Sequence, residues 1–243
     1  MTLRLLVRTL ARRLLMSTVR PLVAPLANHL LDADARNIER WRYRQSLAET
    51  GRFVEEHLPA VPSCRSAAEL LGQAAALVRD GAADGLVCEF GVYRAASLNR
   101  LADLLPGRTV WGFDSFAGLP ADWRDRFPRG TYAVRRLPRV RRNARLVQGW
   151  FDDTLAPFLA EHPGPALLLH VDCDLYASTR TVLDAFAGRL TPGTVLVFDE
   201  YFNYPGWQQE EYRAFHEFVE RTGARFEYVG YCRYAEQVAV RLL

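Results

Sequence analysis

The chain has 243 residues, of which 49% are hydrophobic and 24% are charged, with 16 Gly and 13 Pro. These fractions are those of an ordinary globular protein, and they exclude a disordered chain, a collagen-like repeat and a coiled-coil rod. The net charge of +3 is unevenly distributed, because residues 1–50 carry +5 and the rest of the chain carries −2. A nucleic-acid-binding protein usually has its basic patch on the folded domain, so this distribution argues against nucleic acid as a partner.

The cysteines predict a reduced protein. Cys64, Cys88, Cys173 and Cys232 form no CxxC pair and have no spacing typical of zinc ligands. A chain of this length buries enough surface to fold without disulfides or a structural metal. We therefore expect a cytoplasmic location.

An amphipathic helix is expected at the N-terminus. Residues 1–20 place Leu3, Leu6, Leu10 and Leu14 at helical spacing, with arginines between them. These arginines interrupt any apolar run long enough for a signal peptide or a transmembrane span. Three interpretations stay open: a helix that packs on the domain or on another subunit, a helix on a membrane surface, and a frayed tail. The first is favoured, and with it a homo-oligomer.

A second helix is expected to begin near Asp34, a candidate N-cap, and to run to about Leu58 with a weak point at Gly51. We therefore assign residues 1–60 to a helical arm that serves oligomerisation or acts as a lid. Residues 61–243 form the main domain.

The main domain alternates helices with short apolar runs. A helix over residues 66–79 precedes runs of the kind that form strands buried on both faces. The expected strands are 86–90, 110–114, 145–149, 166–172 and 194–200, followed by 226–231 and 237–242. This pattern predicts a doubly wound, seven-stranded, mostly parallel α/β sheet of Rossmann-like type that ends in an antiparallel hairpin.

Ligands of such sheets bind outside the carboxyl ends of the strands. The first strand ends in Glu89, and Gly91 and a helix follow, which suggests a nucleotide-type turn although GxGxxG is absent. The alternative is a plain strand-to-helix turn. The second strand ends in Asp114, whose carboxylate could accept both hydroxyls of a ribose. The alternative for Asp114 is a helix N-cap.

Four carboxylates follow two later strands. Asp172 and Asp174 end one of them, and Asp199 and Glu200 end the next. Like charges this close repel one another unless a cation neutralises them. Oxygen ligands in this number suit Mg²⁺, or Ca²⁺ or Mn²⁺ in its place, and no Cys/His pair accompanies them to indicate zinc. The alternative is that one or two of them cap the following helices.

Five segments together carry a resemblance to a known family. They are EFGVYRAAS, GFDSFAGLP, VQGWFDDTL, HVDCDLYAST and VFDEYFNYPG, in this order. They resemble the macrocin O-methyltransferase family over residues 64–243. The resemblance implies a class I methyltransferase fold. It also implies metal-dependent transfer of a methyl group from S-adenosylmethionine to a hydroxyl of a small molecule, such as a sugar or phenol of a natural product.

The resemblance also implies roles for individual residues. Glu89, Gly91 and Tyr93 correspond to the methionine side of the cofactor site, with Ser97 nearby. Asp114 corresponds to the ribose contact, with Ser115 beside it, and Gln148, Gly149 and Trp150 correspond to the adenine contacts. Asp172, Asp199 and Glu200 match the metal ligands, and Asp174 matches the general base. Two positions depart from the family pattern: Glu200 stands where Asp or Asn is expected, and the turn after the first strand keeps a single glycine.

Other features leave alternatives open. His170 is expected in the core or behind the site rather than as a base. The seven arginines of residues 129–145 form a solvated loop or a lid over an anionic substrate. The aromatic side chains that follow the second carboxylate pair either contact an acceptor or pack within their loop. They are Tyr201, Phe202, Tyr204 and Trp207.

Two competing functions predict other sequence features. A nicotinamide-dependent oxidoreductase would have GxGxxG and a Tyr/Lys pair, whereas this chain contains no lysine. A membrane-associated or scaffold protein that kept only the fold would have lost the carboxylates at the strand ends, and all of them are present.

Overall fold

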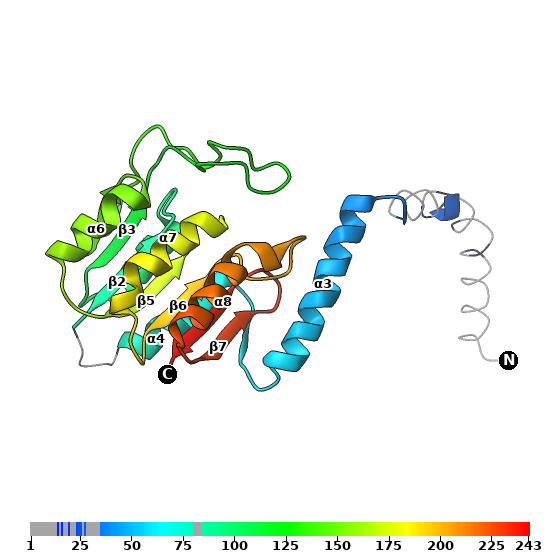
Figure 1. Cartoon of the computed structure of the whole chain (residues 1–243). Helices are drawn as coiled ribbons and strands as arrows, with labels where there is room; N and C mark the ends of the chain where they lie inside the picture. The colour runs from blue at the N-terminus through cyan, green and yellow to red at the C-terminus, as the bar shows by residue number, and fades with distance from the viewer. Residues whose placement is uncertain are drawn as a thin grey trace, which may run out of the picture. The chain divides into compact units, whose positions relative to one another are not determined.

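The structure is a computed structural model that describes residues 35–79 and 84–243, together with 14, 16, 19, 23–25 and 27. The chain forms two compact units, residues 1–45 and residues 46–243. The fold described below is that of the second unit (Figure 1). Most of the expected amphipathic helix over residues 1–20, and the candidate N-cap Asp34, lie outside the described residues.

Helix α3 (Ile38–His57) begins after Asn37, whose side-chain oxygen accepts a hydrogen bond from the N–H of Arg40 at 3.0 Å. Gly51 does not interrupt this helix. Its C-terminal half belongs to the second unit and buries Thr50 and Phe53. The division between the units therefore lies inside α3, about two turns of helix beyond its start and well before residue 60.

One sheet of eight strands forms the centre of the second unit. The strands are β1 (Ser63–Cys64), β2 (Leu86–Phe90), β3 (Val110–Asp114), β4 (Ala144–Gln148), β5 (Ala166–Val171), β6 (Val195–Phe198), β7 (Phe226–Cys232) and β8 (Val238–Leu242), in the spatial order β1-β7-β8-β6-β5-β2-β3-β4. All pairs are parallel except those of β8, which runs antiparallel to β6 and β7. The prediction of a mostly parallel sheet with a terminal hairpin is confirmed. The additional strand, β1, has two residues and is too short to give a periodic signal.

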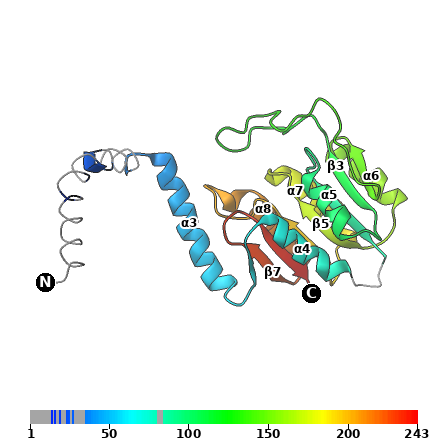
Figure 2. The same cartoon turned by 180° about the vertical axis from the view of Figure 1, so that it is seen from behind.

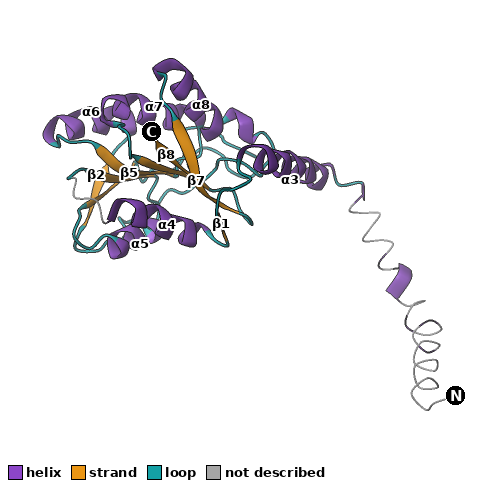
Figure 3. Cartoon of the chain, turned by 90° about the horizontal axis from the view of Figure 1, so that it is seen from below, coloured by secondary structure: helices purple, strands orange, loops and turns teal. Residues whose placement is uncertain are grey.

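Helices cover both faces of the sheet. They are α4 (Ala67–Arg79), α5 (Ala96–Leu104), α6 (Phe151–Glu161), α7 (Tyr176–Phe186) and α8 (Glu211–Thr222), with short 3-10 turns η2 (Ala187–Arg189) and η3 (Trp207–Gln209). Helices α4 and α5 lie on one face (Figure 2), and α6, α7 and α8 lie on the other (Figure 3). All five residues of β2 are buried, as expected for a strand covered on both sides.

The aromatic loop after β6 packs into the core on the α6–α8 side. The side chains of Tyr201, Phe202, Tyr204 and Trp207 are at most 4% exposed. Phe53 of α3 contacts three of these four rings, Phe202 and Trp207 edge-on and Tyr201 at a tilt. These side chains therefore pack within their loop and the core, which is the second of the two interpretations of the sequence.

The strand order produces a crevice at the carboxyl edge of the sheet, where a ligand can bind. From β2 the chain goes to β3 and β4 on one side and to β5 and β6 on the other. The loops that leave β2 and β5 therefore diverge, and a crevice forms at the carboxyl edge where the direction of winding changes.

Candidate active site

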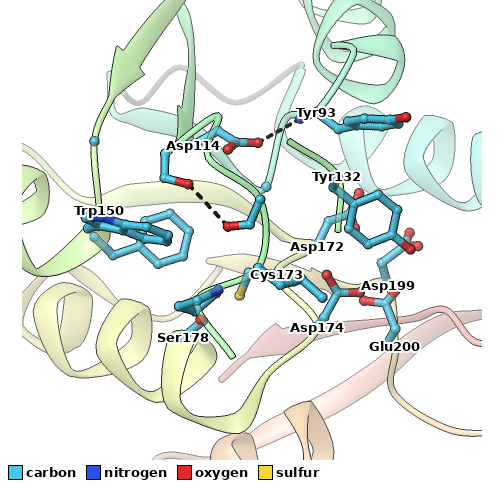
Figure 4. A pocket seen from close by; sticks show the side chains of 17 residues that line it. Tyr93, Asp114, Tyr132, Trp150, Asp172, Cys173, Asp174, Ser178, Asp199 and Glu200 are labelled. Carbon is cyan, nitrogen blue, oxygen red and sulfur yellow. Dashed lines mark hydrogen bonds between the residues drawn. The ribbon is translucent and has the colours of Figure 1, made fainter. Parts of the chain in front are cut away.

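A cavity of about 310 Å³ opens at this edge of the sheet. Its walls come from the loops that follow β2, β3, β4, β5 and β6 (Figure 4). The lining residues are Gly91, Tyr93, Asp114, Ser115, Gly118, Leu119, Pro120, Tyr132, Gly149, Trp150, Phe151, Asp172, Cys173, Asp174, Ser178, Asp199 and Glu200. Most residues to which the sequence assigns a role therefore lie in one cavity.

The turn after β2 depends on its single glycine. Gly91 has a φ of +92°, and a Cβ atom there would lie 1.7 Å from the carbonyl oxygen of Asp172. No other residue type fits so close to a neighbouring main chain. Gly91 thereby brings the loop after β2 against the loop after β5.

The carboxylate of Asp114 organises this turn from the next strand. Its Oδ2 accepts hydrogen bonds from the N–H groups of Val92 and Tyr93, both at 2.8 Å, and its Oδ1 accepts one from the N–H of Phe116 at 2.6 Å. A carboxylate has about four lone-pair sites, so about one is left for a ligand. The N–H groups that donate to Asp114 belong to loop residues and not to the first turn of a helix, so Asp114 is not a helix N-cap.

The remaining residues assigned to the cofactor fall into two groups. Ser115, Gly149 and Trp150 line the cavity with Asp114, whereas Gln148 is exposed and lies outside the lining. Glu89 and Ser97 also lie outside it, as described next.

Glu89 lies behind the cavity wall, with no exposed surface. Its carboxylate accepts a hydrogen bond from the hydroxyl of Ser97 at 3.1 Å and contacts Nδ1 of His170 at 2.9 Å. Burial raises the pKa of Glu89 above its ordinary value. His170 is 3% exposed, and its Nε2 lies 3.5 Å from Oδ1 of Asp199. Burial lowers the pKa of His170, but hydrogen bonds to Asp199 and Glu89 outweigh it, and the net pKa is raised well above its ordinary value.

Four carboxylates lie on the side of the cavity opposite Asp114 (Figure 4). They belong to Asp172, Asp174, Asp199 and Glu200. Burial and the charge of Asp199 raise the pKa of both Asp172 and Glu200 well above their ordinary values. Burial also raises the pKa of Asp174, to about 7, although the charge of Arg124 acts in the opposite direction. The pKa of Asp199 is lowered, because hydrogen bonds from His170 and Gln237 together outweigh the effect of burial.

These residues fit a divalent cation. Oε2 of Glu200 is buried and has no hydrogen-bond partner among the described residues. A buried carboxylate oxygen left without a partner is unfavourable, and a cation would remove this cost. Ligand atoms of His170, Asp172 and Asp199 lie within 4.8 Å of one another. This group thus contains His170, whereas the resemblance assigns the third ligand to position 200; the carboxylate of Glu200 lines the same cavity.

A lid loop, residues 115–134, forms part of the cavity wall. It is closed at its base by hydrogen bonds from the N–H of Leu119 to the carbonyl of Thr131 and from the N–H of Gly130 to the carbonyl of Leu119, at 2.8 and 2.9 Å. Tyr132 follows this base in a left-handed conformation (φ +70°), and its ring contacts the ring of Tyr93 edge-on at 5.3 Å.

The lid loop contains lining residues that the sequence analysis missed, namely Leu119, Pro120 and Tyr132. The sequence signal for Leu119 and Pro120 is the Gly118-Leu119-Pro120 turn, whereas Tyr132 has no such signal. Among the described residues that line the cavity there is no arginine. One arginine of residues 129–145, Arg141, forms a bidentate ion pair with Asp103 instead.

Comparison with known proteins shows what the chain is similar to. Residues 88–201, which contain the loops that build most of the cavity, match a family described as a methyltransferase domain. The resemblance carried by the five segments is confirmed, because the relatives found for this chain are named as O-methyltransferases.

Two relatives illustrate the similarity. The chain is 35% identical over 152 residues to the 8-demethyl-8-(2,3-dimethoxy-alpha-L-rhamnosyl)-tetracenomycin-C 4'-O-methyltransferase of Streptomyces olivaceus, a match that covers 51% of this chain and 56% of that protein. It is 27% identical over 227 residues to the mycinamicin III 3''-O-methyltransferase of Micromonospora griseorubida, which covers 81% of this chain and 85% of that protein. The match thus spans little more than half the length of the tetracenomycin relative.

Solved structures support the fold. A calicheamicin methyltransferase superposes with a TM-score of 0.59 and 25% identity, over 72% of this chain and 77% of its own. The O-methyltransferase NovP superposes with a TM-score of 0.56 and 22% identity, over 72% and 78% of the two chains. The predicted class I methyltransferase fold is confirmed. In the described part of the chain, no helix has both the length and the apolar character needed to cross a membrane.

Proposed function

We propose that this methyltransferase transfers a methyl group from S-adenosylmethionine to a hydroxyl of a small molecule, a sugar or phenol of a natural product, with the help of a divalent cation. The observation that carries the proposal is the composition of the cavity. A single cavity joins the turn at Gly91 and Asp114 to the carboxylates of Asp172, Asp174, Asp199 and Glu200.

The cofactor occupies the side of the cavity formed by the loops after β2, β3 and β4. Gly91 and Tyr93 adjoin its methionine part, and Asp114 offers its remaining lone pair to the ribose, with Ser115 beside it. Trp150 is 41% exposed at the cavity, and its flat ring suits contact with adenine. Glu89 supports this side from behind through Ser97 and His170.

The cation is held by Asp172, Asp199 and Glu200, with His170 behind Asp199. A divalent cation bound there lowers the pKa of an acceptor hydroxyl and orients it. Asp174 then takes the proton, because it lines the same cavity and lies two residues beyond Asp172 without being needed as a ligand. Its backbone is left-handed (φ +64°), and its side chain lies among the other carboxylates in Figure 4.

The acceptor lies between these two sides, beneath the lid loop. Leu119, Pro120 and Tyr132 present apolar and aromatic surface to this space. Such surface suits the faces of a sugar or an aromatic ring. The tetracenomycin relative, whose name describes 4'-O-methylation of a rhamnosyl compound, supports a glycosylated acceptor.

Two further predictions belong to this proposal. The protein forms a homo-oligomer in which the N-terminal arm takes part, and it acts in the cytoplasm. Light scattering on the full chain and on a chain that begins at residue 31 would test the first. An unchanged number of subunits would contradict it.

The central experiment measures ligand binding before turnover. Calorimetry on the full chain with S-adenosylhomocysteine, NAD and Mg²⁺ should show binding of the first and the third, and no binding of NAD. Release of S-adenosylhomocysteine is then measured with S-adenosylmethionine and a panel of nucleotide sugars, glycosides and simple phenols. NAD binding without S-adenosylhomocysteine binding would overturn the proposal.

A further inference from the structure

A buried carboxylate outside the cavity contacts the main chain of the cation site. Glu211, the first residue of α8, has no exposed surface, and its Oε2 accepts a hydrogen bond from the N–H of Glu200 at 3.0 Å. Its Oε1 has no hydrogen-bond partner among the described residues. Burying a carboxylate so completely is costly, so this contact contributes something that an apolar side chain could not.

The peptide group on the other side of Glu200 is also held by a buried side chain. The hydroxyl of Tyr204, which is 1% exposed, donates a hydrogen bond to the carbonyl of Glu200 at 3.2 Å. The preceding N–H, of Asp199, donates to the carbonyl of Val171 at 2.9 Å. The main chain at Glu200 is thus fixed on both sides.

The side chain of Glu200, unlike its main chain, has an atom without a hydrogen-bond partner among the described residues. Its Oε2 is buried and has no partner among the residues that the structure describes, although two buried side chains contact the main chain of the same residue. The main chain is therefore fixed from within the protein, while the carboxylate is left for a ligand from outside.

We propose that Glu211, together with Tyr204, is a positioning residue of the cation site. By fixing the main chain of Glu200, the two side chains hold its carboxylate toward the cation. This inference rests on the proposed function, specifically on a divalent cation at Asp172, Asp199 and Glu200. Residues that orient metal ligands in this way typically change metal affinity by about 10–100-fold when they are removed.

The test measures Mn²⁺ binding alone, by electron paramagnetic resonance of free Mn²⁺ titrated with the full chain. Glu211→Ala should raise the Kd for Mn²⁺ by about 10–100-fold. Glu211→Gln should stay within about threefold of the unmodified protein, because its amide oxygen can accept the same N–H bond. Tyr204→Phe, which removes only the hydroxyl, should raise the Kd by about fivefold, the equivalent of one ordinary hydrogen bond.

Two controls accompany these variants. Glu220→Ala removes an exposed acidic side chain from the same helix and should leave Mn²⁺ affinity unchanged. Affinity for S-adenosylhomocysteine, measured by calorimetry, should be the same in every variant. An unchanged cofactor affinity shows that the cavity is otherwise folded, which a general structural defect would not allow.

The outcomes separate this inference from the proposed function. If the unmodified protein binds Mn²⁺ and Glu200→Gln weakens binding, but folded Glu211→Ala does not, the positioning role is overturned and the cation site stands. Weakening by Glu211→Gln as large as that by Glu211→Ala also overturns it, because the hydrogen bond would then not be the cause. If Glu211→Ala does not fold, an unchanged Kd in Tyr204→Phe overturns it. Absence of Mn²⁺ binding to the unmodified protein overturns the cation site itself.

Discussion

The two sides of the cavity use carboxylates in opposite ways. On the cofactor side, Asp114 accepts three hydrogen bonds from backbone N–H groups. On the opposite side, Oε2 of Glu200 is buried with no partner in the described part of the chain, and Glu200 lines the same cavity as Asp172 and Asp174. The carboxylate of Asp114 thus fixes a loop by accepting hydrogen bonds, whereas the carboxylate of Glu200 has an oxygen without a hydrogen-bond partner among the described residues. The number of donors that the main chain supplies distinguishes the two roles.

Gly91 joins these two sides. The absence of a side chain there allows the loop after β2 to pack directly on the carbonyl of Asp172. The cofactor side is therefore built against the main chain of the carboxylate side. Some substitutions should therefore change only one side of the cavity, whereas a substitution at Gly91 should change both sides.

Removal of the cation should have the largest effect. Chelation by EDTA, or the substitution Asp199→Asn, should lower turnover by on the order of 10⁴-fold, because several kcal/mol of transition-state stabilisation are lost. Affinity for S-adenosylhomocysteine should survive, since Asp199 lies on the other side of the cavity from Asp114. Asp153→Asn, at an exposed position on α6, is the matched control. Full turnover in excess EDTA would show that no cation is needed.

Loss of the base should come next. Asp174→Asn keeps the shape of the side chain but cannot take a proton, so kcat should fall by about 10²–10⁴-fold. Affinities for Mn²⁺ and S-adenosylhomocysteine should stay close to those of the unmodified protein. A large loss of Mn²⁺ affinity in this variant would make Asp174 a ligand. A normal kcat would mean that the cation alone activates the acceptor.

The sheet and the gathering of the carboxylates could be predicted from the sequence, because both depend on local signals. Apolar runs such as residues 86–90 indicate buried strands, and acidic residues at the ends of parallel strands must meet at one edge. The two-residue strand β1 carries no periodic signal. The partners of Glu89 could not be predicted either, since His170 lies 81 residues away in the chain and meets it only through strand pairing.

The roles of Tyr132 and Glu211 could not be predicted from the sequence either, for a different reason. Tyr132 reaches the cavity because the close approach of Gly118 to Gly130 folds the lid loop back on itself, and this contact has no sequence period. Glu211 reads as an ordinary acidic residue in the first turn of a helix, where such residues are common. Only its burial distinguishes it from an exposed acidic residue.

Gly91→Ala should disturb both sides at once. The added Cβ meets the carbonyl of Asp172 in a backbone conformation that disfavours side chains, so the free energy of unfolding should fall by about 3 kcal/mol or more. Gly107→Ala, where a Cβ would meet nothing within 4 Å, is the control and should change little. Denaturant unfolding measures both. If Gly91→Ala unfolds like the control, the close contact between the two loops is wrong.

Asp114 should give the smallest effect and the sharpest separation of roles. Asp114→Ala removes the acceptor of three backbone N–H groups, so the free energy of unfolding without any cofactor should fall by about 2 kcal/mol. Affinity for S-adenosylhomocysteine should also fall, by about tenfold or more, because the ribose contact and the turn are lost together. Asp114→Asn should be nearly as damaging, since its NH₂ group must face one of those N–H donors.

Denaturant unfolding of the cofactor-free protein and calorimetry with S-adenosylhomocysteine measure the two effects separately, with Ser115→Ala as the neighbouring control. Mn²⁺ affinity should be unchanged, because the carboxylates across the cavity do not depend on Asp114. A residue that only binds ribose would lower cofactor affinity and leave the stability of the cofactor-free protein intact. That result would mean that the three backbone hydrogen bonds contribute nothing to the fold. The contrast between a satisfied and an unsatisfied carboxylate would then no longer account for the two sides of the cavity.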